Sequence, residues 1–332
     1  MKSGELGNRD VMQGQPPSGP LLDISGLTKT FPGAARTAVD DITLSVSAGE
    51  ILGLVGLNGA GKTTTIRIAA GLNKPSSGHV TVGGFDIVRD KVEASARVGL
   101  VPEFPNFDPG AKALSLLRYF AGYHGFRGQQ ATDRCSALLK VVGLDKTVEL
   151  RFRTFSQGMK KRFALAAALT GEPQVLLLDE VLNGLDPQGI ALVRQLVMDW
   201  RGEGRAILLS SHLLNEVQQV ADRVAIVHLG RLVRVLSREE LANGRSGVLR
   251  ISIVDLDSET MGYLATKGTI RRDGSTVWIA NPTIEADEIN ADLIRRGCHV
   301  KSLSFESTSL ESLFLSLIEE PAPEPASDES NE

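Results

Sequence analysis

The sequence of 332 residues has only two cysteines, Cys135 and Cys298, which lie far apart and outside any Cys-x-x-Cys pattern. Such sparse use of cysteine excludes a disulfide framework and a cysteine-based zinc site, and it indicates a reducing compartment. The start of the sequence lacks a basic segment followed by an apolar one, so we expect no signal peptide. No apolar run approaches the roughly 18 residues that a membrane helix needs, so we expect no bilayer span.

An excess of positive charge is also missing. Lysine and arginine number 36 against 40 aspartates and glutamates, which leaves a net charge of −4. This balance argues against a general nucleic-acid binder, and we predict no specific nucleic-acid partner. A local basic cluster does occur, and we interpret it as a solvated face of the protein. Its members are Arg151, Arg153, Lys160, Lys161 and Arg162.

The sequence does contain an α/β pattern between residues 20 and 240. Residues 50–56, 175–179 and 206–211 are short and almost wholly apolar, as in strands buried on both faces of a sheet. Two more strands are predicted at 21–31 and 38–50. Helices are predicted at 61–72, 161–171, 189–204 and 213–222. Residues 1–19 and the acidic residues 319–332 are expected to be disordered.

A second domain is predicted at 247–318. The order there is strand, helix, hairpin, helix and strand, with Asp273-Gly274 as the hairpin turn. The order β-α-β-β-α-β predicts a small α+β domain of the split βαβ type. A last helix is predicted at 309–320, with Leu310, Leu313, Phe314 and Leu317 on one face.

A glycine-rich loop follows the first buried strand. Residues 56–63 read GLNGAGKT, which matches the phosphate-binding pattern G-x-x-x-x-G-K-[ST]. Glycines let backbone N–H groups turn toward a phosphate, and the following helix adds its positive N-terminus. The predicted nucleotide-binding residues of this loop are Gly56, Leu57, Asn58, Gly59, Ala60, Gly61, Lys62, Thr63 and Thr64. Lys62 would reach the β- and γ-phosphates of ATP, and the Thr63 hydroxyl would ligate Mg²⁺.

A pair of acids ends the second buried strand, in VLLLDE at 175–180. Asp179 is the predicted partner of Mg²⁺, and Glu180 would polarise an attacking water. Without the phosphate loop, two acids that end a strand would be read as a structural feature only.

Four further short segments each contain a residue or a turn that could belong to a nucleotide site. GLVPEFPNF at 99–107 has a lone carboxylate, Glu103, which by itself would be read as a solvated loop residue. FSQGMKKR at 155–162 puts a turn at a helix N-terminus, a second potential anion site. NGLDP at 183–187 follows the acid pair, and SSH ends at His212.

The phosphate loop, the acid pair and these four segments, taken in their order along the chain, resemble those of the ATP-binding subunits of ABC transporters. The resemblance extends over roughly residues 21–240. The resemblance implies a P-loop ABC ATPase core with a helical subdomain at about 104–165. It also implies a head-to-tail dimer with two ATP molecules between the chains. Each site would join the phosphate loop of one chain to the FSQGMKKR turn of the other.

The resemblance implies a role for each matching residue. Glu180 would be the general base and Asp179 would hold Mg²⁺ through water. His212 would contact the γ-phosphate, and Asp186 would lie between the two sites. Phe31 would stack on adenine, with a core or strand-edge aromatic as the alternative. Ser156, Gln157 and Gly158 would bind the nucleotide of the partner chain.

Two positions depart from the common family pattern. Gln157 replaces a glycine at the less constrained place of the turn, and Glu103 stands where glutamine is usual. Glutamate keeps the oxygen ligand for Mg²⁺ but adds a negative charge near the triphosphate. We therefore predict Glu103 to be a metal-facing residue that takes part in catalysis, as in the exporter branch that this sequence resembles.

The ending STSLESLFLSLIEE and the form FSQGMKKR resemble the drug-resistance and lipid or polysaccharide exporter branch. That branch implies a separate membrane permease of about six helices and a second ATPase chain, identical or homologous. The protein would lie at the cytoplasmic face of a bacterial membrane and touch the membrane only through the permease, with residues 104–130 as the coupling segment. The second domain would stabilise the dimer or regulate it; an appended fold without a ligand is the alternative.

Two other functions remain open from the sequence. One is a soluble ABC-type ATPase that acts on ribosomes or DNA, although the chain has one cassette and no heptad run. The other is a regulatory cassette without turnover, although Glu180 and His212 are both present.

Overall fold

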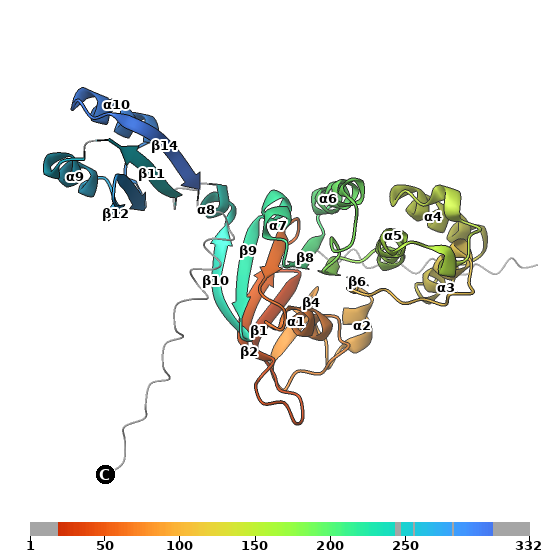
Figure 1. Cartoon of the computed structure of the whole chain (residues 1–332). Coiled ribbons are helices and arrows are strands. Elements are labelled where there is room, and N and C mark those ends of the chain that lie inside the picture. The colour runs from red at the N-terminus through yellow and green to blue at the C-terminus, as the bar shows by residue number, and fades with distance from the viewer. Residues whose placement is uncertain (1–18, 243–246, 255, 281, 308–332) are drawn as a thin grey trace, which may run out of the picture. The chain divides into compact units, whose positions relative to one another are not determined.

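The computed structural model describes residues 19–242, 247–254, 256–280 and 282–307 (Figure 1). The chain divides into two compact units. One unit comprises residues 1–52, 59–210 and 229–231, and the other comprises residues 53–58, 211–228 and 232–332. The domain boundaries near residues 240 and 247 remain a prediction.

The strands and helices follow one another in α/β order. The strands are β1 (Leu22–Lys29), β2 (Val39–Val46), β3 (Ile51–Val55), β4 (Ser77–Val82), β5 (Phe85–Asp86), β6 (Val98–Val101), β7 (Val175–Asp179), β8 (Ala206–Ser211), β9 (Arg223–His228), β10 (Arg231–Ser237), β11 (Gly247–Ile253), β12 (Thr269–Asp273), β13 (Thr276–Ala280) and β14 (Val300–Ser307). The helices are α1 (Lys62–Ala69), α2 (Lys91–Ser95), α3 (Ala113–Tyr123), α4 (Gly128–Val141), α5 (Gln157–Ala168), α6 (Pro187–Gly202), α7 (Leu214–Val220), α8 (Arg238–Ala242), α9 (Ser258–Ala265) and α10 (Ala286–Arg295), with short 3₁₀ turns at Asp145–Thr147 and Phe152–Thr154.

The strands of the described residues form three sheets. A six-stranded sheet has the order β10-β9-β3-β8-β7-β6, and a four-stranded sheet has the order β2-β1-β4-β5. Strands β3, β7 and β8 are buried along their whole length, as their nearly continuous apolar sequences predict. Strands β6, β7 and β8 pair in parallel, so their carboxyl ends lie at one edge of the sheet. That edge carries the residues that end β7 and β8.

Helices α3, α4 and α5 pack together (Figure 1), and a group of phenylalanines lies at α3, α5 and the segments before them. Phe107 lies with its ring centroid 5.0 Å from that of Phe152 and 5.1 Å from that of Phe163. Phe163 on α5 is fully buried. The apolar contact area of these rings fixes α5 against the segment that follows Glu103. The predicted helical subdomain, about 104–165, takes in this whole group.

The C-terminal sheet has the order β12-β13-β11-β14, and every pair in it is antiparallel. With α9 after β11 and α10 after β13, this topology confirms the predicted split βαβ arrangement. Its fully buried core takes Leu249 and Ile251 from β11, Leu264 from α9, and Ile289 and Leu293, four residues apart, from α10. The predicted helix at 309–320 and the predicted tail at 319–332 lie outside the described residues.

The sequence left several elements unassigned, among them β4, β6, β9 and β10. Strand β6 has only four residues, and β10 has a single buried residue, so neither carries a strong periodic signal. Within the described ranges, no helix is both long enough and apolar enough to cross a membrane.

Candidate active site

The phosphate loop connects β3 to α1. Gly59 and Gly61 adopt positive φ angles of 78° and 107°, a region that favours glycine. A Cβ atom on Gly61 would lie 2.6 Å from the carbonyl oxygen of Ala38, so only glycine fits there. Gly61 is also the N-cap of α1 and gives it no side-chain cap. The first N–H groups of α1 are therefore presented with their positive dipole end, as phosphate binding requires.

The predicted loop residues divide by exposure. Leu57, Asn58 and Gly59 are exposed, whereas Gly56 and Ala60 are buried. Lys62 is the first residue of α1 and is buried, and Thr63 and Thr64 are half-buried. The loop is thus a turn with an exposed tip, and the lysine that follows it is buried in the protein.

Asp179 and Glu180 end β7 beside the start of α1. The Thr63 hydroxyl donates to Asp179 Oδ1 at 3.1 Å. Lys62 Nζ lies 3.4 Å from Glu180 Oε1, and both side chains are only 6% exposed. Four of the predicted site residues are therefore brought into direct contact, although Lys62 and Glu180 are 118 positions apart in the sequence.

Ser210 at the end of β8 joins the two acids. Its hydroxyl donates to Asp179 Oδ1 at 2.7 Å and accepts a hydrogen bond from the backbone N–H of Glu180 at 3.0 Å. The side chain of Ser210 is completely buried. Sequence reasoning used Ser210 only as part of the SSH motif and did not predict this contact.

Glu180 has an unusual backbone. Its φ angle is +47°, in the left-handed region that residues other than glycine rarely adopt. Such a conformation raises the free energy by about 1–3 kcal/mol and is concentrated at functional sites. Asn183 Nδ2 donates to Glu180 Oε2 at 3.0 Å. Together with Lys62, this contact fixes both oxygens of the Glu180 carboxylate.

A lysine that the sequence analysis treated as solvated belongs to the same site. Lys161 is 7% exposed, and its ammonium group donates to the backbone carbonyl oxygen of Glu180 at 2.6 Å. The solvated-face interpretation is therefore wrong for this member of the basic cluster. The signal was present in the helical spacing, because Lys161 shares a face of α5 with the buried residues Ala164 and Leu165.

The charge of Lys161 is influenced by the acids of the site, Glu103 among them. Burial lowers the pKa of Lys161, and the carboxylates of Glu103, Glu180 and Asp179 oppose that shift, Glu103 most strongly. Glu103 follows β6 and is half-buried. Its interpretation as a solvated loop residue does not fit these observations; its predicted contact with Mg²⁺ remains a prediction.

The turn of FSQGMKKR begins α5. Ser156 is the N-cap, and its hydroxyl accepts a hydrogen bond from the backbone N–H of Met159 at 3.2 Å. Ser156 and Gln157 are exposed, and Gly158 is half-buried. The N-terminus of a helix of 12 residues is thus presented at the surface, where a nucleotide on another chain could reach it.

Asp186, His212 and Phe31 lie at the surface. Asp186 is the N-cap of α6, and its carboxylate accepts from the backbone N–H of Gly189 at 3.0 Å. His212 directly follows β8 and is exposed. Phe31 is 38% exposed, and Lys29 Nζ lies 5.0 Å from its ring centroid. Phe31 is therefore not a core aromatic; its stacking on adenine remains a prediction.

The residues of the site fit the predicted Mg²⁺. Hydroxyl and carboxylate oxygens, such as those of Thr63 and Asp179, are ligands that Mg²⁺ prefers. Across the residues that the structure describes, no three His, Cys, Asp or Glu side chains gather as a metal site.

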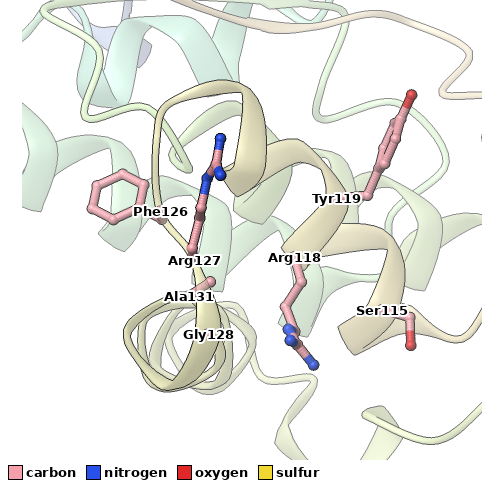
Figure 2. Close-up of a pocket in the computed structure, with 7 residues that line it drawn as sticks. All are labelled: Ser115, Arg118, Tyr119, Phe126, Arg127, Gly128 and Ala131. Carbon is pink, nitrogen blue, oxygen red and sulfur yellow. The ribbon is translucent and has the colours of Figure 1, made fainter.

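A pocket of about 390 Å³ lies at the start of α4, away from the acids (Figure 2). Arg118 and Tyr119 of α3 line it together with Phe126 and Arg127, which lead into α4. Its other lining residues are Ser115, Gly128 and Ala131. Its lining thus includes two arginines and two aromatic residues, side-chain types that suit an acidic or aromatic partner segment.

Comparison with known proteins adds three curated relatives. The family model described as ABC transporter matches residues 39–183. Bacitracin transport ATP-binding protein BcrA of Bacillus licheniformis is 31% identical, over 90% of this chain and 97% of that protein. Daunorubicin/doxorubicin resistance ATP-binding protein DrrA of Streptomyces peucetius is 31% identical, over 94% and 96%. Nod factor export ATP-binding protein I of Cupriavidus metallidurans is 35% identical, over 79% and 87%.

Solved structures agree with these matches. An ATP-binding subunit of an ABC transporter superposes with a TM-score of 0.62 at 25% identity, over 82% of this chain and 99% of that chain. A bacterial ABC transporter cassette solved as a dimer gives a TM-score of 0.61, over 65% of this chain and 98% of that chain. At 23% identity, the second match concerns the fold alone.

Proposed function

The chain belongs to the family of ABC transporter ATP-binding proteins, and on that basis we propose that it powers the export of a drug, lipid or other hydrophobic compound. As a member of the family it is an ATP-binding subunit and an ATPase that works with a membrane permease and dimerises. The direction of transport and the class of compound are the new parts of the proposal.

One observation carries the catalytic part of the proposal. The side chains of Lys62 and Glu180 meet at 3.4 Å, and those of Thr63 and Asp179 meet at 3.1 Å. A phosphate-binding lysine, a carboxylate base and a hydroxyl–carboxylate pair for a cation therefore lie within one buried cluster. This is the set of groups that phosphoryl transfer to water requires.

In the proposed reaction, residues 56–64 wrap the β- and γ-phosphates with backbone N–H groups, and Lys62 adds its charge. Glu180 accepts a proton from the attacking water, and His212 orients that water against the γ-phosphate. Thr63, Asp179 and Glu103 would hold Mg²⁺, which would neutralise the negative charge of the phosphate groups when bound. Phe31 stacks on adenine.

The proposed assembly is a dimer of two ATPase chains, identical or homologous. Ser156, Gln157 and Gly158 of one chain bind the γ-phosphate held by the loop of the other, because their helix N-terminus is exposed. Asp186 lies between the two nucleotide sites. The domain at 247–318 stabilises or regulates this dimer.

The proposed partner is a membrane permease of about six helices, which would hold the chain at the cytoplasmic face of the membrane. The coupling segment is 104–130, which includes most of the residues that line the pocket of Figure 2. Export is supported by the relatives, whose names refer to bacitracin transport, daunorubicin/doxorubicin resistance and Nod factor export.

The variant Glu180→Gln tests the proposal, because it keeps the shape of the side chain and removes the base. We expect ATP turnover to fall by about 10²- to 10⁴-fold while ATP binding is retained. In cells that also carry the neighbouring permease, efflux of a fluorescent hydrophobic drug should stop. The control is Glu172→Gln, an exposed glutamate that pairs with Arg134 and also has a positive φ.

Two results would contradict the proposal separately. Wild-type turnover in Glu180→Gln would show that the base is assigned to the wrong residue. Equal drug efflux with wild type and with Glu180→Gln would show that export is not the function that this ATPase drives. A soluble ATPase of ribosomes or DNA would hydrolyse ATP without any permease-dependent efflux.

A further inference from the structure

Lys160 and Lys161 are adjacent in the sequence but lie in different environments. Lys160 is half-buried, and its ammonium group lies 5.9 Å from the ring centroid of Phe152. Lys161 is only 7% exposed and is directed at the end of β7. A lysine is almost never buried without a partner that offsets the loss of hydration. The partners of Lys161 therefore explain why it is there.

The first partner is the main chain of Glu180. The 2.6 Å hydrogen bond from Lys161 Nζ reaches the carbonyl oxygen of the residue whose φ angle is +47°. A hydrogen bond from a charged donor is stronger than one between neutral groups. This contact therefore helps to hold Glu180 in a backbone conformation that a glutamate would not adopt by itself.

The second partner is a group of three carboxylates. Burial lowers the pKa of Lys161, while Glu103, Glu180 and Asp179 raise it, in that order. The geometric contact of the ammonium group is the one with the carbonyl oxygen of Glu180, at 2.6 Å, and the three carboxylates add a negative environment that favours its charged form. Among the residues that the structure describes, Lys161 and Lys62 of the phosphate loop are the buried lysines.

We propose that Lys161 is a positioning residue for ATP hydrolysis, which holds the backbone of Glu180 in place and offsets the negative charge of Glu103. A glutamate in the segment after β6 is then compatible with a triphosphate site because the positive charge of Lys161 offsets its negative charge. The inference rests on the proposed roles of Glu180 and Glu103 and adds a residue to which no role had been given.

The pairing has a clear physical consequence. Without the ammonium group, three carboxylates would face the phosphates of ATP, and the Glu180 carbonyl oxygen would lose its donor. Removing the charge of Glu103 at the same time should reduce the repulsion between the carboxylates and the phosphates. It should not restore the hydrogen bond to the Glu180 carbonyl oxygen. The effects of the two changes should therefore be non-additive, as expected for groups that interact directly.

A double-mutant cycle on the full-length chain tests this inference. Lys161→Met keeps the length of the side chain and removes its charge and donors. We expect kcat to fall by about 10- to 100-fold, the range for loss of a charge-assisted hydrogen bond, with the KM for ATP changed by less than about threefold. Glu103→Gln alone is the reference for the double variant: the fall in kcat caused by Lys161→Met should be smaller, by about threefold or more, in the Glu103→Gln background than in the wild-type background.

Lys160→Met is the matched control, because it makes the same substitution one position away and is expected to leave kcat unchanged. Lys161→Gln is a second variant, which lacks the charge but can still donate to the Glu180 carbonyl oxygen. It should lie between wild type and Lys161→Met in kcat. Thermal unfolding of each variant separates a loss of turnover from a loss of folding.

Three outcomes would overturn the inference. These are a wild-type kcat in Lys161→Met, losses that simply multiply in the double variant, and failure of both Lys161 variants to fold. The last outcome would make Lys161 a residue of the core only. Absence of turnover in the wild-type chain would overturn the proposed function and this inference together, whereas the three outcomes above leave the proposed function standing.

Discussion

At the scale of single residues, Ser210 links Asp179 and Glu180 through hydrogen bonds. Its buried hydroxyl donates to the first acid and accepts from the backbone of the second. Ser210→Ala leaves a buried carboxylate and a buried N–H group each short of one partner. We expect a loss of about 1–3 kcal/mol in the free energy of unfolding and about a tenfold fall in kcat.

Denaturant unfolding and steady-state ATPase assays check this prediction. Ser237→Ala is the control, because its hydroxyl also accepts from a backbone N–H, that of Glu240, but lies at the surface. Full stability of Ser210→Ala would mean that water replaces both bonds at no measurable penalty.

Single residues also show where prediction from sequence succeeds. The motifs predicted that Lys62, Thr63, Asp179 and Glu180 share one site, and their side chains lie in contact in the structure; their roles in hydrolysis stay predictions. The contact of Lys161 does not follow from a motif. Its charge indicated a solvated face, and only its helical spacing relative to Ala164 and Leu165 indicated burial. Ser210 gave no signal beyond its place before His212.

At the scale of elements, the pocket between α3 and the start of α4 is the best place to separate ATP hydrolysis from transport. Arg118 lines the pocket and is exposed, and Lys62 and Glu180 lie in other elements. Arg118→Glu should reduce drug efflux in cells with the permease by about tenfold or more through charge repulsion of the partner segment. The KM for ATP of the purified chain should stay within about twofold of wild type.

Arg67→Glu on α1 is a control for charge reversal at an exposed arginine outside the coupling segment. Loss of ATP binding in Arg118→Glu would move the segment 104–130 into the nucleotide site. Unchanged efflux would remove this pocket from the proposed coupling surface.

Elements were predicted according to the strength of their periodic signal. The apolar strands β3, β7 and β8 and the β-α-β-β-α-β order of the C-terminal sheet were identified correctly. Strand β6 was not assigned, although Glu103 follows it, because four residues are too few for a periodic pattern. Helix α4 was also missed, and its three buried residues, Ala131, Cys135 and Leu139, are spaced four apart among polar ones.

At the scale of the whole molecule, the proposed site is complete only when two chains meet. The exposed turn at Ser156 would supply N–H donors to the nucleotide of the partner chain. In Glu180→Gln, where ATP is bound but not hydrolysed, we expect a dimer in the presence of ATP and Mg²⁺. Ser156→Arg in the same background should prevent it, because a bulky side chain would occupy the place of the γ-phosphate.

Size-exclusion chromatography with light scattering measures the dimer, with Ser115→Arg on α3 as the control for a surface arginine. An ATP-dependent dimer that survives Ser156→Arg would exclude the head-to-tail arrangement. A dimer that is equally stable without ATP would assign the association to another surface.

Helix α5 has a consequence at this scale. Its N-cap, Ser156, faces the surface, and Lys161, about 7.5 Å further along the helix axis, holds the backbone of Glu180. Because a short helix moves as a rigid body, a displacement of the turn at Ser156 also displaces Lys161. Docking of a second chain on Ser156 would thus change the position of the hydrolytic base of the first chain, and the two nucleotide sites would be coupled through less than two turns of one helix.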